Sequence, residues 1–560
     1  MAAVTVIDHG LSLEEQCEAI WDATRAEERR EQNQRQIPPV ALLWDGEMRL
    51  QHLVQAEYGG TFDLIEGDTG PGQLEHPLDH PVGEWLWDEW GRMQRGEKRN
   101  VNITVEYTGS RWGGLLEYVE LDKRDNGDQV VVATFSSDYE RLKWYTVWSN
   151  SFFSEHFQAP RVFILPGPIP WVLSTMLDLQ CHRERNSTWA MPDDPMDPAN
   201  RTNLDQSTWS LVVKPIKFMD SLNSGALWGI AGSRFKNFHD IAKTMMQDGE
   251  ITPVVRRYLH GDPPPWPGAN LRHGTVVVSF EDRSGRFTGT SQGGTRFDGL
   301  KMTVEKFIGD FIESTSQLVT DTTIPAEYYI PGSKRTNKSL PLAVWRDGEE
   351  TGLDRYRFRK TPSKGIQVVT GGSSAPGVDE LMSATVQMLG DLTAMIPGVP
   401  PMGGVADAVL KPFYMGTVLA WMVARLVARA NNQGWTRYFE YFQDGAGKAY
   451  TISSLMVLRA GIWATRSYES IEFGARDAAP FLISETGHVW LGDRAGFTMQ
   501  KDKTGRIYID RISKVGLSWS REQPVTRTVT IGDSRALEDP VQKAWERIEA
   551  FATSLQQLGV

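Results

Sequence analysis

The chain has 560 residues and a mass of 62.9 kDa, which exceeds the size at which one hydrophobic core keeps growing and predicts about three or four domains. Its formal net charge of −12 argues against sequence-independent DNA binding, because phosphate contacts need clustered Lys and Arg. Cys17 and Cys181 are too few for a disulfide scaffold or a cysteine-rich metal site. The opening residues, MAAVTVIDHG, lack the pattern of a signal peptide, so we expect synthesis and folding in a cytoplasm.

Residues 1–37 are predicted to form an N-terminal helical arm. Apolar residues recur there at steps of three and four, at Leu13, Cys17, Ile20 and Trp21. The prolines of IPPVALLWD then end the helix.

Residues 38–151 are predicted to form a first β domain, because short apolar runs alternate with Gly, Asp and Asn. Within VNITVEYTGSRWGGLLEYVEL, residues 101–121, two strands are expected, with the turn supplied by the glycines at 109, 113 and 114. Arg111 and Trp112 would then stand at the hairpin tip, where a cation beside a large aromatic ring suits a contact with a neighbouring subunit. The alternative is that Trp112 folds back onto its own sheet, with Arg111 stacked over it.

Residues 152–273 are predicted to form a mixed α+β insertion and residues 274–370 a second α+β domain, since helical and strand-like patterns both occur. Helices and strands follow one another in blocks and not in strict alternation. This favours a β-rich, multidomain α+β protein over a doubly wound sheet.

Residues 371–449 contain the most apolar part of the sequence. They are predicted to form a helical segment, with two helices joined at PGVPPMGG. A membrane hairpin is the alternative, although the uncharged run from 413 to 424 is shorter than the roughly 20 residues that a spanning helix needs. The candidates for a channel plug, or for a membrane or partner contact, are Met395, Ile396, Pro400, Met402 and Phe413.

Residues 450–533 are predicted to form a C-terminal β-barrel, because several short strands recur at regular spacing. Residues 534–560 then read as an amphipathic helix, with Asp539 as N-cap and Pro540 at the first position.

The sequence contains no P-loop, dinucleotide fingerprint, zincin motif or nucleophile elbow. His76 and His80 have a metal-like spacing, but the prolines at 77 and 81 argue against the helix that such a site needs. We therefore assign no catalytic, cofactor-binding or metal-binding residue and expect no enzyme activity and no cofactor.

Several phrases occur in an order that resembles one family. They are TGSRWGGLLEYVEL, QAPRVFILPGP, YLHGDPPPWPG, VVVSFEDRSGRFTGT, VVTGGSSAPGVDELM, GHVWLGDRAGF and TVTIGD. Together they resemble the large minor tail proteins of long-tailed phages of actinobacteria, the mycobacteriophage tail-tip proteins taken to form the baseplate hub. The resemblance runs from about residue 35 to the C-terminus.

The resemblance implies a virion structural protein at the tail tip, made in the host cytoplasm. Three copies would form a ring below the tail tube, with two tube-forming β-barrel-like domains per chain, at 38–151 and 450–533. The insertions between them would form the outer wall and distal cap. The implied partners are the distal tail protein, the tape-measure protein, other minor tail proteins and the host envelope, while DNA passes transiently without specific binding during genome ejection.

Two other functions stay open from the residues. A tail-borne carbohydrate-binding adhesin could use exposed rings among Trp85, Trp87 and Trp90, although their spacing favours burial of most of them. A cell-wall hydrolase would need two carboxylates that converge in a cleft, and no residue is nominated for them.

Overall fold

The computed structural model describes most of the chain. The described residues are 10, 12–153, 155–185, 205–223, 226, 228–249, 251–283, 303–308, 311–316, 341–349, 352–371, 421–444, 461–462, 464–465, 468–478, 481–502 and 507–532.

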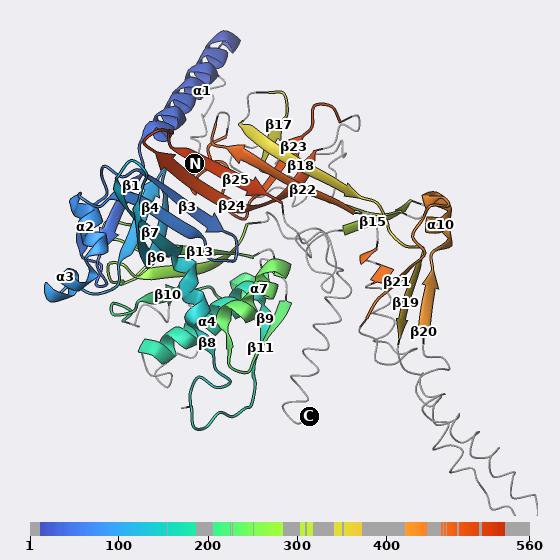
Figure 1. Cartoon of the computed structure of the whole chain (residues 1–560), viewed down its shortest axis with the longest axis horizontal. Coiled ribbons are helices and arrows are strands. Elements are labelled where there is room, and N and C mark those ends of the chain that lie inside the picture. The colour runs from blue at the N-terminus through green and yellow to red at the C-terminus, as the bar shows by residue number, and fades with distance from the viewer. Residues whose placement is uncertain are drawn as a thin grey trace, which may run out of the picture.

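One 13-stranded sheet dominates the described part of the chain (Figure 1). Its main path runs β18-β22-β25-β24-β3-β4-β7-β6-β5-β1-β2, and β17 and β23 branch from it at β24. The N-terminal strands are β1 (Val40–Trp44), β2 (Leu50–Leu53), β3 (Gly59–Ile65), β4 (Pro71–Pro77), β5 (Asn102–Tyr107), β6 (Ser110–Lys123) and β7 (Gln129–Ser137). The later strands are β17 (Ala343–Arg346), β18 (Leu353–Thr361), β22 (Tyr468–Arg476), β23 (Arg494–Thr498), β24 (Tyr508–Ser520) and β25 (Thr526–Ile531).

The two β-rich parts of the sequence meet where β24 pairs antiparallel with β3. Seven residue pairs join these strands, from Lys514↔Ile65 to Ser520↔Gly59. Leu517 of β24 packs into the core of the N-terminal strands, and Leu64 of β3 packs against both that core and the core of the C-terminal strands. The expected β-rich, α+β fold class is confirmed, and the two β parts form one continuous sheet.

The two faces of this sheet differ in character at its C-terminal end. Directly paired residues lie on the same face, and one row is buried: Phe473, Ile531 and Ile512 are at most 1% exposed. The row on the opposite face contains Arg355, Gly474, Thr530 and Lys514. This end of the sheet therefore has an apolar inner face and a polar outer face.

A mixed α+β module packs beside the main sheet. It contains β9 (Phe163–Pro168), α4 (Ile169–Arg185), β10 (Leu211–Val213), α6 (Phe218–Asn223), β11 (Trp228–Ser233), β12 (Lys236–Asn237), α7 (Phe238–Gly249), β13 (Ile251–Arg257) and β14 (Val276–Asp282). Its core also takes in η1 (Asp138–Trp144) and β8 (Thr146–Val147), which follow β7 directly. The strand β14 pairs with both β13 and β10, so it packs with the elements that precede it in the chain.

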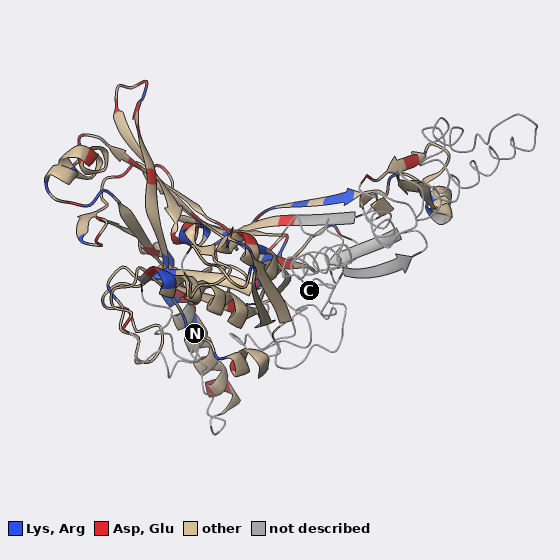
Figure 2. Cartoon of the chain, turned by 90° about the horizontal axis from the view of Figure 1, so that it is seen from below, with Lys and Arg blue, Asp and Glu red and all other residues tan. Residues whose placement is uncertain are grey.

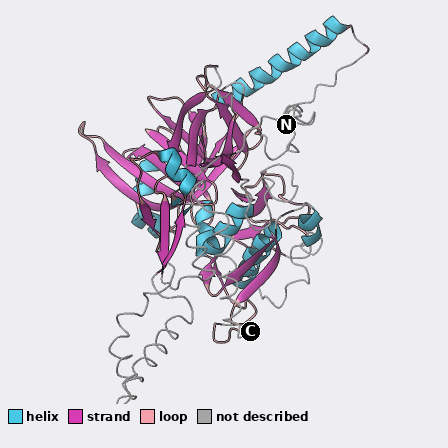
Figure 3. Ribbon diagram, turned by 90° about the vertical axis from the view of Figure 1, so that its right-hand side faces the viewer, coloured by secondary structure: helices cyan, strands magenta, loops and turns pink. Residues whose placement is uncertain are grey.

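Helix α1 (Leu13–Gln36) confirms the helix expected in the N-terminal arm. Ser12 and Glu15 form a capping box at its start, with the Ser12 amide donating to Glu15 Oε2 at 2.9 Å. Figure 3 shows this helix projecting from the strand-rich body. Arg35 in its last turn bonds Asp477 at 3.1 Å, which ties the arm to the C-terminal part of the chain.

A small separate sheet contains β19 (Gln367–Gly371), β20 (Trp421–Arg425) and β21 (Glu440–Phe442), with α10 (Val427–Gln433) beside it. The prediction of a helix over this apolar text is wrong at residues 421–425, because they pair with β19 as an antiparallel strand. Trp421 and Val423, which favour strands, share one exposed face. The proposed plug residues Met395, Ile396, Pro400, Met402 and Phe413, and the C-terminal helix, lie outside the described residues.

The remaining described elements are short. α2 (Pro81–Trp87) packs against β4, β6 and β7, and α3 (Glu89–Gln94) packs against α2. β15 (Thr303–Ile308) and β16 (Phe311–Ser316) form a hairpin. Among the described residues, no helix combines the length and apolar character that a membrane crossing requires.

Candidate functional site

The hairpin between β5 and β6 turns at Thr108 and Gly109. Their φ angles are 48° and 78°, and Tyr107 pairs with Ser110 across the turn. Positive φ at both central residues is the signature of a type I′ hairpin turn. Glycines 113 and 114 lie within β6, so their predicted place in the turn is wrong, and Arg111 and Trp112 are strand residues and not tip residues.

Trp112 is buried within its own chain and is 4% exposed. Its indole Nε1 donates to the Asp63 carbonyl at 2.8 Å, and its ring meets Phe62 edge-on with centroids 5.0 Å apart. Of the two interpretations of this ring, the structure matches the one in which it folds back onto its own sheet.

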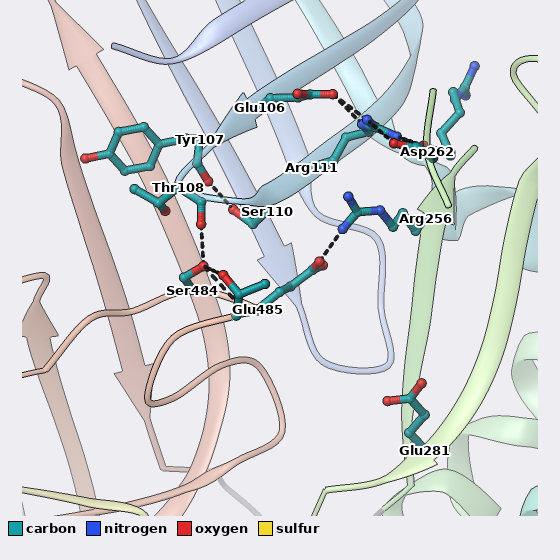
Figure 4. Close-up of polar contacts among 12 residues, drawn as sticks. Glu106, Tyr107, Thr108, Ser110, Arg111, Arg256, Asp262, Glu281, Ser484 and Glu485 are labelled. Carbon is teal, nitrogen blue, oxygen red and sulfur yellow. Dashed lines mark hydrogen bonds and ion pairs between the residues drawn. The ribbon is translucent and has the colours of Figure 1, made fainter. Parts of the chain in front are cut away.

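Arg111 is 7% exposed and reaches from β6 to the mixed module (Figure 4). Its Nη1 donates to the Arg257 carbonyl at 2.8 Å, its Nη2 to Asp262 Oδ1 at 3.0 Å and its Nε to Glu106 Oε1 at 2.7 Å. In the single chain, Arg111 and Trp112 are buried and make intramolecular contacts, and their contact with a neighbouring subunit stays a prediction. Arg111 joins two parts of one chain.

A second buried pair lies beside it. Arg257 at the end of β13 bonds the carboxylate of Asp138 at the start of η1, with its Nε 2.9 Å from Oδ2, and the two side chains are 0% and 3% exposed. Arg257 also donates to Asn102 Oδ1 at 2.8 Å. Burial alone would raise the pKa of Asp138, but the charge and hydrogen bonds of Arg257 outweigh it and hold that pKa below its usual value.

The loop after residue 481 completes the contact zone from the C-terminal side. Ser484 donates to the Thr108 carbonyl, and Glu485 pairs with Arg256 of β13 (Figure 4). Burial raises the pKa of Glu485 despite the nearby arginine charges. The contact zone thus lowers the pKa of Asp138 and raises the pKa of Glu485.

Arg527 of β25 anchors the same turn. It donates to Thr108 Oγ1 and Ser110 Oγ, each at 2.7 Å, and to the Ile483 carbonyl at 3.0 Å. Its guanidinium also lies over the Tyr107 ring, 4.7 Å from the centroid. Burial lowers the pKa of Arg527 to about 10.

We call this contact zone the polar seam, defined by Arg111, Asp138, Arg256, Arg257, Asp262, Ser484, Glu485 and Arg527. It joins the N-terminal strands, the mixed module and the C-terminal strands. Its arginines bond carboxylates or carbonyl groups of the same chain. We therefore interpret the polar seam as a structural contact between parts of the chain. Sequence reasoning found Arg111 and missed the others, because nothing in the pattern near Asp138 or Glu485 distinguishes them from surface carboxylates.

The described residues contain no group of three or more His, Cys, Asp or Glu placed to hold a metal ion. His76, proposed and rejected as a ligand, is fully buried on β4, with its Nε2 2.8 Å from the Gln55 carbonyl. Its ring lies 4.6 Å from that of His80, centroid to centroid.

Two strands stand at the ends of the main path of the sheet, and β17 ends its branch. β2 and β18 each have one neighbour in the strand order within the described chain. Leu50 and Leu53 on β2 are 55% and 47% exposed. β18 has the sequence LDRYRFRKT and exposes its arginines.

Comparisons with known proteins show which family the chain is similar to. The family described as Siphovirus ReqiPepy6 Gp37-like protein matches residues 40–533. The minor tail proteins Gp28 of Mycobacterium phages D29 and L5 are each 30% identical to the chain, over 98% of it and all of their own length. The tail protein of Neisseria meningitidis MC58 has 8% identity and a TM-score of 0.34, over 90% of this chain and 99% of that one.

The family match and the two Gp28 relatives support a structural role in the virion tail of a siphophage. By a match that spans most of its length, the chain belongs to the Siphovirus ReqiPepy6 Gp37-like protein family.

Proposed function

We propose that the protein is the tail-tip baseplate hub, in which three copies close into a ring that continues or closes the tail tube. The observation that carries this proposal is the pairing of β3 with β24. It sets the N-terminal and C-terminal β parts side by side in one sheet, the arrangement that adjoining wall segments of a tube require. Genome ejection would take DNA through this ring.

The open ends of the sheet supply a way to close the ring. Edge strands present unpaired backbone donors and acceptors, which template pairing with another chain. Contact between the β2 edge of one copy and the β18 edge of the next is heterologous and closes into a ring if each step rotates by the same angle. Exposed Leu50 and Leu53 give the β2 edge apolar area for that contact.

Contacts with other tail proteins have a separate candidate surface on the small sheet. The exposed aromatic residues on its strands and on the segment that follows α10 are Trp421, Trp435, Tyr438, Phe439, Tyr441 and Phe442, with Trp435 91% exposed. Aromatic residues are enriched in interface cores. The distal tail protein, the tape-measure protein, other minor tail proteins or the host envelope would meet the hub there. In this proposal the protein is structural and has no catalytic activity of its own.

The test is the absolute mass by light scattering, alone and mixed with the neighbouring tail proteins. A hub gives three times 62.9 kDa in at least one condition. The variant Leu50→Lys/Leu53→Lys should prevent ring closure, because closure would bury the new charges at the β2 edge. The control is Leu13→Lys on α1, which should leave the mass unchanged because Leu13 is 79% exposed. A chain that stays monomeric with its neighbours refutes the ring.

A carbohydrate-binding adhesin is the second candidate, favoured by a cleft of about 700 Å³ between α2 and the β6–β7 turn. Its lining residues are Tyr58, Pro77, Leu78, Asp79, Glu84, Trp87, Asp88, Gly127, Asp128 and Gln129. Trp87 is 47% exposed while Trp85 supplies the buried ring of the same helix. An exposed ring can stack on a sugar, while neighbouring carboxylates accept hydrogen bonds from its hydroxyl groups.

Saturation-transfer NMR with a panel of neutral oligosaccharides tests this second function. Trp87→Ala should abolish the signal, and Trp90→Ala should not, because Trp90 is 75% exposed but does not line the cleft. No signal with the unmodified protein would remove the adhesin function.

A further inference from the structure

A row of arginines runs along one face of the edge strand β18. Arg355, Arg357 and Arg359 occupy alternate positions, so their side chains share a face and follow one another at about 7 Å. All three are exposed. Figure 2 shows this run of Lys and Arg along the strand that reaches toward the small sheet.

The side chains of these three arginines have no described role in the fold. Within the described part of the chain, none of the three side chains makes an ion pair or a hydrogen bond, whereas their backbones pair with β22. Glu472, the residue paired with Arg357 on β22, makes no ion pair with it among the described residues. In contrast, Lys514 on the same face is held by Asp63 at 2.7 Å.

The opposite face of β18 does the packing. Phe358 packs against the core of the C-terminal strands, and the Tyr356 ring lies 5.4 Å from that of Phe497. Stability therefore accounts for Tyr356 and Phe358 but not for the arginines. Three exposed arginines in a row, without an ion pair among the described residues, offer a binding surface for a ligand of opposite charge.

We propose that the β18 arginine row, Arg355, Arg357 and Arg359, is a contact for the phosphate backbone of DNA. Guanidinium groups bind phosphates through paired hydrogen bonds, and a row of them on an extended strand suits a polymer that is charged at every unit. The proposal rests on the proposed hub function for its biological setting, in which the DNA is the passing genome. The binding itself is a property of the single chain.

The expected contact is weak and non-specific. Three phosphate contacts give a salt slope of about −2.7 on B-DNA, so the affinity should fall about 40-fold between roughly 50 and 200 mM salt. The acidic remainder of the surface disfavours further contacts. DNA would thus contact the protein transiently at β18 and would not be retained there.

The experiment measures fluorescence anisotropy of a labelled DNA duplex of about 20 base pairs with the full chain across this salt range. The variant R355S/R357S/R359S removes the row. Its matched control, R49S/R95S/R99S, makes the same change in charge at arginines paired with Glu47, Glu97 and Glu89 at 2.8, 2.8 and 2.6 Å. Circular dichroism of both variants checks that they fold.

We expect the row variant to lose about tenfold or more in affinity at the lowest salt, together with most of the salt slope, while the control stays within about twofold of the unmodified chain. Equal loss in both variants, or none in the row variant, overturns the proposal. So does an unmodified chain that does not bind DNA at the lowest salt.

Light scattering on the same samples separates this proposal from the ring. A monomeric chain whose DNA binding still depends on the row refutes the ring and supports the contact. A row variant that loses the trimer mass but keeps its DNA affinity shows that the row is a subunit contact, and it overturns the proposal.

Discussion

Replacing Asp138 by Asn tests the buried ion pair of the polar seam, which joins η1, directly after β7, to β13 of the mixed module. Asn keeps the shape of Asp138 but leaves the charge of Arg257 without its carboxylate, at a site where the two side chains are 0% and 3% exposed. The other side-chain partners of Arg257, Asn102 and the sulfur of Met48, are neutral. Breaking one partner of a buried ion pair costs about 3 to 5 kcal/mol.

Hydrogen–deuterium exchange measures this cost locally, which suits a multidomain chain that does not unfold in one step. A loss of about 3 kcal/mol accelerates exchange by roughly 150-fold in peptides that cover β13 and η1. Asp122→Asn on the exposed end of β6 is the control and should change the free energy of opening by less than about 0.5 kcal/mol.

A double variant decides whether the uncompensated charge is the cause. Asp138→Asn combined with Arg257→Met removes both charges, so it should exchange more slowly than Asp138→Asn alone. If the single variant protects β13 as well as the unmodified chain does, or if the double variant is the worse of the two, the electrostatic account of the polar seam is refuted.

Three further predictions follow from the same structure. Burial alone would raise the pKa values of Asp138 and Asp262, but their arginine partners outweigh it and hold both pKa values below the usual range. The two carboxylates therefore stabilise the folded chain above about pH 4, and this stabilisation is lost as the pH falls through their folded-state pKa values. Hydrogen–deuterium exchange of β13 at decreasing pH measures the loss. Gly109→Ala should destabilise the hairpin by about 1 kcal/mol, since φ there is 78° and the added Cβ would lie 3.0 Å from Thr486 Oγ1; exchange of β5 and β6 peptides detects it. Ser12→Ala removes the capping box of α1 and should cost about 1 kcal/mol of helix stability, seen as faster exchange in its first turns.

The local elements could be predicted from the sequence where one physical signal dominates. The alternation of apolar and polar residues from Val101 to Tyr107 predicts β5 correctly, and its apolar residues Val101, Ile103 and Val105 are at most 1% exposed. The alternation does not predict that the polar row is also buried, with Asn102 and Thr104 at most 4% exposed. The sequence does not place the turn uniquely, because the glycines at 109, 113 and 114 are all compatible with one. The turn forms at Gly109, where Thr108 also takes a positive φ. The strand at Trp421–Arg425 was missed because an apolar run of that length also suits a helix, and its pairing with β19 decides.

The candidate site could be predicted far less well. The pairing of β3 with β24 joins residues about 450 positions apart, and no local pattern encodes such a partner. The polar seam has the same origin, because Arg111, Asp138 and Arg257 become partners through the packing of three parts of the chain. Arg111 stood out in the sequence by its neighbour Trp112, and its partner Asp262 did not.

The continuous sheet and the polar seam together connect the N-terminal strands, the mixed module and the C-terminal strands of one chain. The pairing of β3 with β24 joins the N-terminal and C-terminal strands, and the polar seam adds hydrogen bonds between the mixed module and strands β5 and β6. Its buried ion pairs are costly to break one at a time, so the three parts should move as one body. A ring that transmits load along a tail needs this rigidity within each chain. Rigidity of that kind leaves the exposed edges β2 and β18, and the small sheet beyond them, as the places where contacts with other chains would form.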